Sequence, residues 1–324
     1  MSLPRTGRLR RLAEELEENG LELGDDGEPI AMLIEEVDLA VRPPTHERRV
    51  VSSGTMLDPT ADPATWGPGA SLDITRQPLL DQPLPDARRF ADGVASWIVR
   101  RTDGPAEWLV FDRPAGSERD LVVLAGVLGA TIVQRHPSGV VRVVGSFGVL
   151  RWNGLAWHRE PPVDSWIDAV GACAAHGDPV VFHALLEFAV HDLAAAGIGS
   201  LLIYRPDAEP GPAVEERLPT PPPVDIRRPT HLAPLRHALS QIDGAAVFDG
   251  DGVLRQLGVR LVPSAAAEAS VAAVGGTRHT SARRYSHDDP RASVIVVSED
   301  GPVSVMRMGH ILGQSPGARG RTPA

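Results

Sequence analysis

The residues best suited to bind a charged ligand are gathered between residues 273 and 300. Glycines at 275 and 276 let a ligand approach the backbone closely, where exposed N–H groups bind anions. Arginine adds a fixed fork of donors that suits phosphate oxygens, and threonine and serine add neutral donors. These residue types follow in the order Thr277, Arg278, His279, Thr280, Ser281, Arg283 and Arg284. The stretch predicts a donor-rich loop for a polyphosphate, ahead of a buried strand at residues 292–297. The alternative is an ordinary solvated loop or helix start.

A second stretch upstream adds a carboxylate. Asp243 and Gly244 precede a short apolar run at residues 245–248, which predicts a strand. The turn after this strand is already supplied by the Asp-Gly-Asp-Gly run at residues 249–252, so we expect a hairpin with residues 253–257. Asp243 then lies at the entrance of the strand, where a carboxylate can hold a divalent cation beside phosphates.

Together, the two stretches resemble the signature motifs of the diadenylate cyclase (DAC) domain family, of the DisA N-terminal type. The first motif is Asp-Gly-Ala at residues 243–245, and the second is Gly-Thr-Arg-His at residues 276–279. The surroundings are also similar, with Leu261 shortly before Pro263 and a Val-Val-Ser-Glu segment at residues 296–299. The resemblance covers roughly residues 182–312.

The resemblance implies an enzyme of second-messenger signalling. Members of the family condense two ATP molecules into cyclic di-AMP and release two pyrophosphates. Each domain holds one ATP, and two domains meet face to face. The implied protein is a metal-dependent nucleotidyltransferase that uses Mg²⁺ or Mn²⁺, binds ATP, and self-associates through its cyclase domain.

The family's roles can be transferred to matching positions of this sequence. Asp243 would bind the metal and help to activate the attacking hydroxyl, and Arg278 and His279 are the other catalytic candidates. Leu261 would lie at the adenine. The nucleotide-binding candidates are Gly244, Ala245, Leu261, Gly276, Thr277, Thr280, Ser281, Ser298 and Glu299.

The sequence departs from the family pattern at two positions. Thr280 stands where the family has a second arginine, and Arg283 and Arg284 are candidates to replace its charge. Ile242 stands where some members have a histidine. If the charge is not replaced, the alternative is a catalytically weak or inactive nucleotide-binding regulatory module of the same fold. A second alternative is a nucleotidyl-transfer or hydrolytic enzyme that uses a single ATP.

Composition excludes several other classes. All 32 basic residues are arginine, and the absence of lysine excludes a Walker A loop, a protein kinase and Schiff-base chemistry in their usual forms. A net charge of −10 argues against general nucleic-acid binding. The single cysteine, Cys173, excludes an internal disulfide framework. We expect no membrane segment and no signal peptide, and therefore a cytoplasmic protein.

We expect an α/β (α+β) protein. Its C-terminal domain, residues 178–312, should have a central mixed β-sheet flanked by helices, one of them at residues 183–196. A smaller α+β domain at residues 86–177 should act as a sensor that regulates how two cyclase domains meet. Residues 1–85 read as an N-terminal helix and a Pro/Gly-rich irregular segment, and residues 313–324 as a disordered tail.

Overall fold

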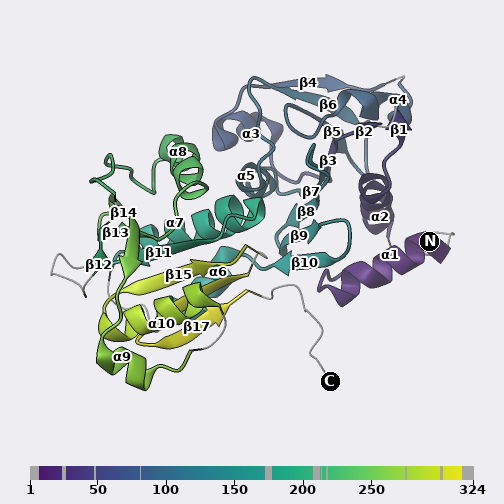
Figure 1. The fold of residues 1–324 in the computed structure, drawn as a ribbon. Coiled ribbons are helices and arrows are strands. Elements are labelled where there is room, and N and C mark those ends of the chain that lie inside the picture. Colours follow the sequence, from purple (N-terminus) through teal and green to yellow (C-terminus); the bar gives the residue numbers. More distant parts are fainter. Residues whose placement is uncertain are drawn as a thin grey trace. The chain divides into compact units, whose positions relative to one another are not determined.

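The structure is a computed structural model that describes residues 7–23, 27–46, 49–80, 82–171, 177–206, 212, 214–216, 218–273, 276–299 and 302–315. The chain divides into two compact units, Met1–Pro162 and Val163–Ala324 (Figure 1). The predicted boundary after residue 177 therefore lies too late. Helix α6 (Val163–Gly171) belongs to the C-terminal unit, because Val163 and Trp166 are buried in its core.

The N-terminal unit is built on a mixed eight-stranded sheet in the order β10-β9-β8-β7-β3-β5-β6-β4. Only β3 and β5 pair in parallel among its described ladders. Two short strands, β1 (Thr45–His46) and β2 (Arg49–Val50), form a separate hairpin. The strands of the large sheet are β3 (Ser53–Leu57), β4 (Ile74–Pro78), β5 (Ser96–Arg100), β6 (Glu107–Phe111), β7 (Thr131–Arg135), β8 (Val141–Gly145), β9 (Gly148–Trp152) and β10 (Trp157–Glu160).

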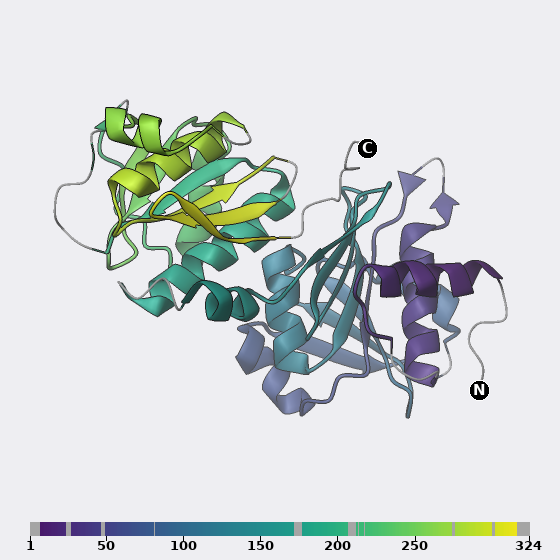
Figure 2. The ribbon, with the colours of Figure 1, turned by 90° about the horizontal axis from the view of Figure 1, so that it is seen from below.

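Helices cover both faces of this sheet (Figure 2). Alternate residues of a strand face opposite sides, so Leu57 packs with helices α1 and α2 while Met56 packs with α3 and α5. The same alternation separates Val133 from Ile132 on β7. The helices of the unit are α1 (Gly7–Glu18), α2 (Glu28–Val41), α3 (Pro63–Ala70), α4 (Leu84–Ala87), the 3-10 turn η1 (Arg88–Phe90) and α5 (Glu118–Leu128).

The prediction of a Pro/Gly-rich irregular segment in the later part of residues 1–85 is wrong. This part of the chain supplies β3, which lies in the interior of the sheet between β7 and β5, and the edge strand β4. The apolar part of β3 is only Met56 and Leu57, too short to stand out among its Pro-rich and Gly-rich surroundings. Helix α3 begins at Pro63, because proline is well tolerated at the first turn of a helix. Asp62 caps this helix by accepting a hydrogen bond from the amide of Ala64.

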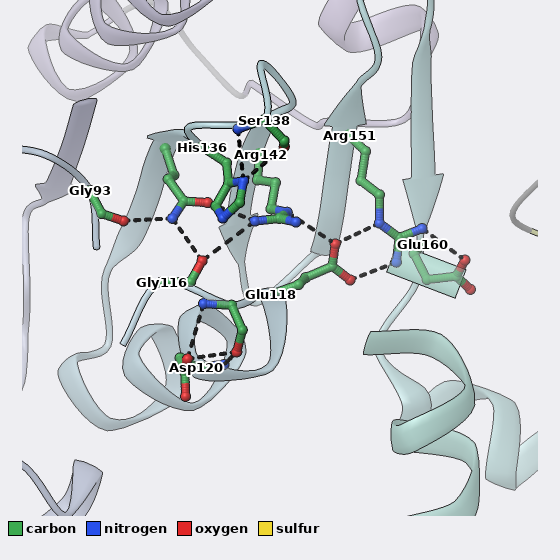
Figure 3. A network of polar contacts seen from close by, with 11 residues as sticks. Gly93, Gly116, Glu118, Asp120, His136, Ser138, Arg142, Arg151 and Glu160 are labelled. Carbon is green, nitrogen blue, oxygen red and sulfur yellow. Dashed lines mark hydrogen bonds and ion pairs between the residues drawn. The ribbon is translucent and has the colours of Figure 1, made fainter. Parts of the chain in front are cut away.

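A buried charged cluster ties the start of α5 to the sheet (Figure 3). The side chain of Glu118 is fully buried and accepts two hydrogen bonds of 2.6 Å from Arg151 on β9. Arg142 on β8 lies 3.5 Å from the same carboxylate and donates to Gln134 on β7 at 2.9 Å. Four elements of the unit are therefore joined by charge-assisted hydrogen bonds inside the core.

The C-terminal unit contains the expected mixed sheet, in the order β12-β14-β13-β11-β15-β16-β17. Strands β11 and β13 are parallel, and the other described pairs are antiparallel. The central strands are buried on both faces, as a sheet between two helical layers requires. The strands are β11 (Ser200–Tyr204), β12 (Val214–Glu215), β13 (Ala245–Phe248), β14 (Leu254–Leu261), β15 (Ser293–Val297), β16 (Val303–Arg307) and β17 (His310–Gln314).

Two groups of helices flank this sheet. On one face, α6, α7 (Pro179–Glu187), the π-helical turn η2 (Phe188–Leu193), the 3-10 turn η3 (Ala194–Ala196) and α8 (Pro229–Leu239) contribute to one core. On the other face, α10 (Thr277–Asp288) buries Ala282 and Tyr285 against β11, β13 and β15, and α9 (Ala265–Ser270) lies beside α10. The predicted helix at residues 183–196 is confirmed in position, although its middle is π-helical.

Three local predictions in this unit are wrong. The donor-rich segment that starts at Thr277 is the helix α10 rather than a loop. The strand expected to end at residue 257 continues to Leu261 as one irregular strand, β14, with shifts in its register against β13. The predicted tail at residues 313–324 begins too early, because β17 continues to Gln314, whereas residues 316–324 lie outside the described residues.

By length and composition, one described segment, Pro179–Ala196, could cross a membrane. The expectation that no stretch of the chain is long and apolar enough is therefore wrong. This segment consists of α7, η2 and η3, and 61% of it is buried inside the structure. Leu185, Phe188 and Leu193 are fully buried in the core of the unit. Buried core helices often have this length and composition, so these two properties are weak evidence for a membrane span.

Candidate functional site

A pocket of about 510 Å³ opens in the C-terminal unit where β13, β14 and the start of α10 meet. Its described lining includes six of the predicted site residues, namely Asp243, Gly244, Leu261, Thr277, Arg278 and Ser281. The fold therefore brings the two sequence motifs to one place. The other residues that line it are Leu201, Gly258, Val259, Arg260, Pro263 and Glu268.

Asp243 is placed at this pocket by a close contact of two strands. Gly244 has a φ of +113°, which favours glycine, and a Cβ there would lie 2.7 Å from the carbonyl carbon of Gly258. The backbone that leads into β13 therefore touches β14 directly. Asp243 itself is exposed, and no hydrogen bond or ion pair of its side chain occurs within the part of the chain that the structure describes. Its carboxylate is available to a ligand.

The first turn of α10 supplies hydrogen-bond donors. The helix begins at Thr277 after Gly276, which has no side chain to cap it, and its first backbone bond runs from the amide of Thr280 to the carbonyl of Gly276 at 3.1 Å. Among the described residues, the amides of Thr277, Arg278 and His279 have no acceptor. Free amides and the positive end of the helix dipole favour an anion here. Ser281 follows Thr277 by one helical turn and faces the same pocket.

Arg278 is held at the edge of the pocket by Glu299. Its Nη1 lies 3.0 Å from Oε1 of Glu299, and the side chains are 37% and 69% exposed. A Cβ at Gly199 would lie 2.2 Å from this guanidinium, so glycine at that position leaves room for Arg278. The ion pair is open to solvent and weak, so phosphate oxygens can compete for Arg278.

Several predicted residues lie outside the described lining of the pocket. Ala245 is fully buried in β13, and the amide of Ser298 donates to the carbonyl of Pro302 at 2.9 Å. His279 turns toward β16, where its Nε2 lies 3.5 Å from Oγ of Ser304, and burial lowers the pKa of its imidazole. Gly276, Thr280 and Glu299 adjoin pocket residues without lining it.

Sequence reasoning missed two charged residues of the wall. Arg260 projects from β14, and its Nη1 is 3.5 Å from Oε2 of Glu215. Glu268 comes from α9. Neither residue belongs to a motif, and only the packing of α9 and β14 around α10 brings them to the site.

The two arginines proposed to replace the family's second arginine differ in position. Arg283 donates from Nε to the carbonyl of Gly309 at 3.1 Å. Arg284 places Nη1 3.6 Å from Oε1 of Glu268, on the pocket wall. Arg284 is therefore the better placed of the two, and the replacement itself stays a prediction.

The site suits a divalent cation that is held jointly with a substrate. Among the described residues, no group of three or more His, Cys, Asp and Glu side chains could form a complete metal cage. Mg²⁺ in phosphate-transfer sites commonly takes one or two carboxylates and completes its shell with phosphate oxygens and water. Asp243, exposed and without a described partner beside the first turn of α10, fits that arrangement.

A mixed sheet with a carboxylate at a strand entrance and an uncapped helix start in one pocket is an arrangement suited to an anionic ligand and a cation. Residues 187–311 match the family described as DisA bacterial checkpoint controller nucleotide-binding (DAC). This part of the chain belongs to that family, the diadenylate cyclase domains. Residues 10–160 match a family described as "Probable sensor domain DACNK".

Two solved structures are similar to parts of this chain. One is a hypothetical membrane spanning protein from Bacillus cereus, with a TM-score of 0.31 and 20% identity over 46% of this chain and 68% of that one. The other is a double mutant of DacA from Staphylococcus aureus, with a TM-score of 0.26 and 18% identity over 42% of this chain and 85% of that one. Comparison with curated proteins gave no match.

Proposed function

We propose that the protein is a diadenylate cyclase that condenses two ATP molecules into cyclic di-AMP and two pyrophosphates. The observation that supports this most is the meeting of Asp243, Thr277, Arg278 and Ser281 in one pocket of a domain of that family. The carboxylate and the phosphate-binding groups come from separate motifs, and the reaction needs both in one place.

The triphosphate of one ATP would lie at the first turn of α10. Free amides, the hydroxyls of Thr277 and Ser281 and the guanidinium of Arg278 would bind its oxygens. Leu201 and Leu261, both among the lining residues, would contact the adenine. Since the pocket presents one such set of groups, the second ATP would come from the pocket of a second copy of the domain.

Each half-reaction is a displacement at phosphorus. The 3′-oxygen of one ATP forms a bond to the α-phosphorus of the other, the bond from that phosphorus to the bridging oxygen of pyrophosphate breaks, and the hydroxyl proton leaves to solvent. A bound Mg²⁺ or Mn²⁺ would neutralise the charge that develops on the phosphate oxygens. Asp243 would hold that cation and orient the attacking hydroxyl, and Arg278 would stabilise the charge on the transferring phosphate.

The alternative, a catalytically weak or inactive nucleotide-binding module, rests on Thr280. In the structure Thr280 does not belong to the described lining of the pocket, whereas Arg260 and Arg278 do. Loss of the family's arginine at this position therefore leaves two guanidiniums on the wall of the pocket.

We further propose that the N-terminal unit regulates how two cyclase domains meet.

The test is incubation of the full chain with ATP and either Mg²⁺ or Mn²⁺, with products read by mass spectrometry. We expect cyclic di-AMP from the wild type, with specific activity that rises with protein concentration, and none after chelation of the metal. Asp243→Asn should lower the rate by at least ~100-fold, because it removes a charge that acts on the transition state. Asp251→Asn is the matched control, an exposed carboxylate outside the described lining of the pocket.

Other products point to other functions. ADP or AMP without a cyclic dinucleotide would indicate a hydrolytic enzyme. Unchanged ATP that still binds, measured by calorimetry, would indicate the regulatory module, and Thr280→Arg would then be the variant to assay for recovery of activity. An unchanged rate in Asp243→Asn would remove the proposed metal site.

A further inference from the structure

A second pocket, of about 610 Å³, lies within the N-terminal unit. Its wall comes from the end of α2, the connection that follows it, the approach to β3 and the turn of α4 into η1. The apolar part of the lining includes Leu39, Pro43 and Pro85, together with Val51, which is 41% exposed. This volume and this mainly apolar lining are typical of sites for small organic molecules.

The polar part of the lining favours an anion. Its charged residues are Arg88 and Arg89, and hydroxyls come from Thr45, Ser52 and Ser53. No carboxylate is present among the residues that line this pocket in the described structure. Arg89 is largely exposed, and its nearest acid, on Asp86, is 3.8 Å away. Its charge is therefore only weakly compensated.

Arg88 is the residue that joins the pocket to the sheet. Its Nη2 pairs with Oε1 of Glu36, and its Nε is buried without a hydrogen-bond partner in the described structure. Glu36 is itself buried and also accepts hydrogen bonds from Thr55 on β3 at 2.9 Å and from Arg100 on β5 at 2.6 Å. One carboxylate thus serves two guanidiniums. Arg100 has a second acid, since Glu35 lies 3.1 Å away, whereas Arg88 has none among the described ion pairs.

We propose that this pocket binds a small amphiphilic anion, with its carboxylate or phosphate group at Arg88 and Arg89 and its apolar body against Leu39, Pro43 and Pro85. A bound anion would compensate the charge of Arg88 that Glu36 shares with Arg100. Because Glu36 is bonded to the parallel strands β3 and β5, a change at Arg88 reaches the interior of the sheet. The proposal does not depend on the cyclase reaction, since its readout is binding.

The test compares three probes of equal chain length on the full protein by isothermal titration calorimetry: octanoate, octyl phosphate and octanol. We expect at least one of the two anions to bind at a single site and at least ~10-fold more tightly than octanol, since the charged head is what the arginines recognise. The stronger of the two anions identifies carboxylate or phosphate as the preferred head group.

Two variants locate the site. Val51→Trp places a large side chain in the pocket while leaving Arg88, Arg89 and Glu36 in the sequence, and should weaken binding of the anion at least ~10-fold. Leu155→Trp, at a residue that is 88% exposed in the turn between β9 and β10, is the matched control and should bind as the wild type does. Weaker binding in Val51→Trp also distinguishes this pocket from the site at α10, which has its own donors for the phosphate group of octyl phosphate.

Arg88→Gln should remove the preference for an anion over octanol while leaving the apolar wall intact. Its thermal melting curve shows whether the unit is folded, and Val51→Trp keeps the test valid if it is not. Equal affinity for octanol and both anions, no binding of either anion, or wild-type affinity in Val51→Trp would each overturn the proposal.

Discussion

The two units hold their charged groups in opposite ways. In the C-terminal pocket, Asp243 is exposed and has no described partner, and Arg278 keeps 37% of its side chain exposed beside Glu299. In the N-terminal cluster of Figure 3, Glu118 is fully buried between Arg142 and Arg151, whose side chains are 8% and 13% exposed. The first arrangement leaves charge for a ligand, and the second uses its charge to join elements.

The buried cluster shows how a paired arginine differs from a less well paired one. Burial lowers the pKa of Arg142, which Glu118 only partly offsets from 3.5 Å. Burial acts in the same direction on Arg151, yet the bidentate bonds to Glu118 and the charge of Glu160 raise the pKa of Arg151 above its usual value. Because the sequence has no lysine, arginine serves both as the structural cation here and as the ligand-facing cation in the pocket.

The largest difference between the two regions should appear in stability. Glu118→Gln removes the carboxylate that pairs with both Arg142 and Arg151, and leaves Arg151 only the more distant Glu160, at 3.7 Å. Loss of one member of a buried ion pair costs about 3–5 kcal/mol. Asp243→Asn changes an exposed side chain without a described partner and should shift the free energy of unfolding by no more than about 0.5 kcal/mol. Urea unfolding of both variants measures this. Similar losses of unfolding free energy in the two variants would contradict the contrast between the buried cluster and the open pocket.

Much of the candidate site could be predicted because it rests on local sequence. Asp243 sits at the entrance of β13, as the apolar run and the following turn indicated, and the second motif reaches the same pocket. Strand β15 was clear from its continuous apolar residues. Helix α10 was missed because most of its residues are polar and only Ala282, Tyr285 and Ser286 are buried, which is too narrow a stripe for periodicity to reveal.

The parts that escaped prediction depend on contacts distant in sequence. Glu268 and Arg260 reach the pocket only because α9 and β14 pack near α10. Likewise, Glu118 lies in a helix, and nothing in its own segment shows that arginines from β8 and β9 will surround it. Strand β3 is short, and its place inside a large sheet is set by its partners β5 and β7 rather than by its own residues.

A smaller effect should separate the two motif glycines. Gly244→Ala meets both a φ of +113° and the backbone of Gly258 at 2.7 Å, so it should destabilise the C-terminal unit by about 1–3 kcal/mol. Gly276→Ala is the matched control, because its φ is −73° and no atom of the described residues lies within 4 Å of the added Cβ. It should change stability by no more than about 0.5 kcal/mol. Urea unfolding of both variants checks this, and an equal loss would show that Gly276 is also structurally constrained.

The smallest effect concerns two histidines. Burial lowers the pKa of His279, and burial together with the charge of Arg142 lowers the pKa of His136. An unfolded histidine takes up its proton near pH 6.5, so below that pH the unfolded chain binds more protons than the native one. Stability therefore falls as the pH drops toward the two folded pKa values.

Arg142→Met tests this difference, because of the two histidines only His136 has its pKa lowered by the charge of Arg142. The pKa of His136 should then rise toward its ordinary value, while that of His279 stays where it was. Titration of the imidazole Cε1 protons by NMR measures both in one sample, and dispersed signals show that the variant is folded. If the two pKa values moved together, or if neither moved, the N-terminal charges would not act locally, and the contrast between the buried cluster and the open pocket would lose its electrostatic basis.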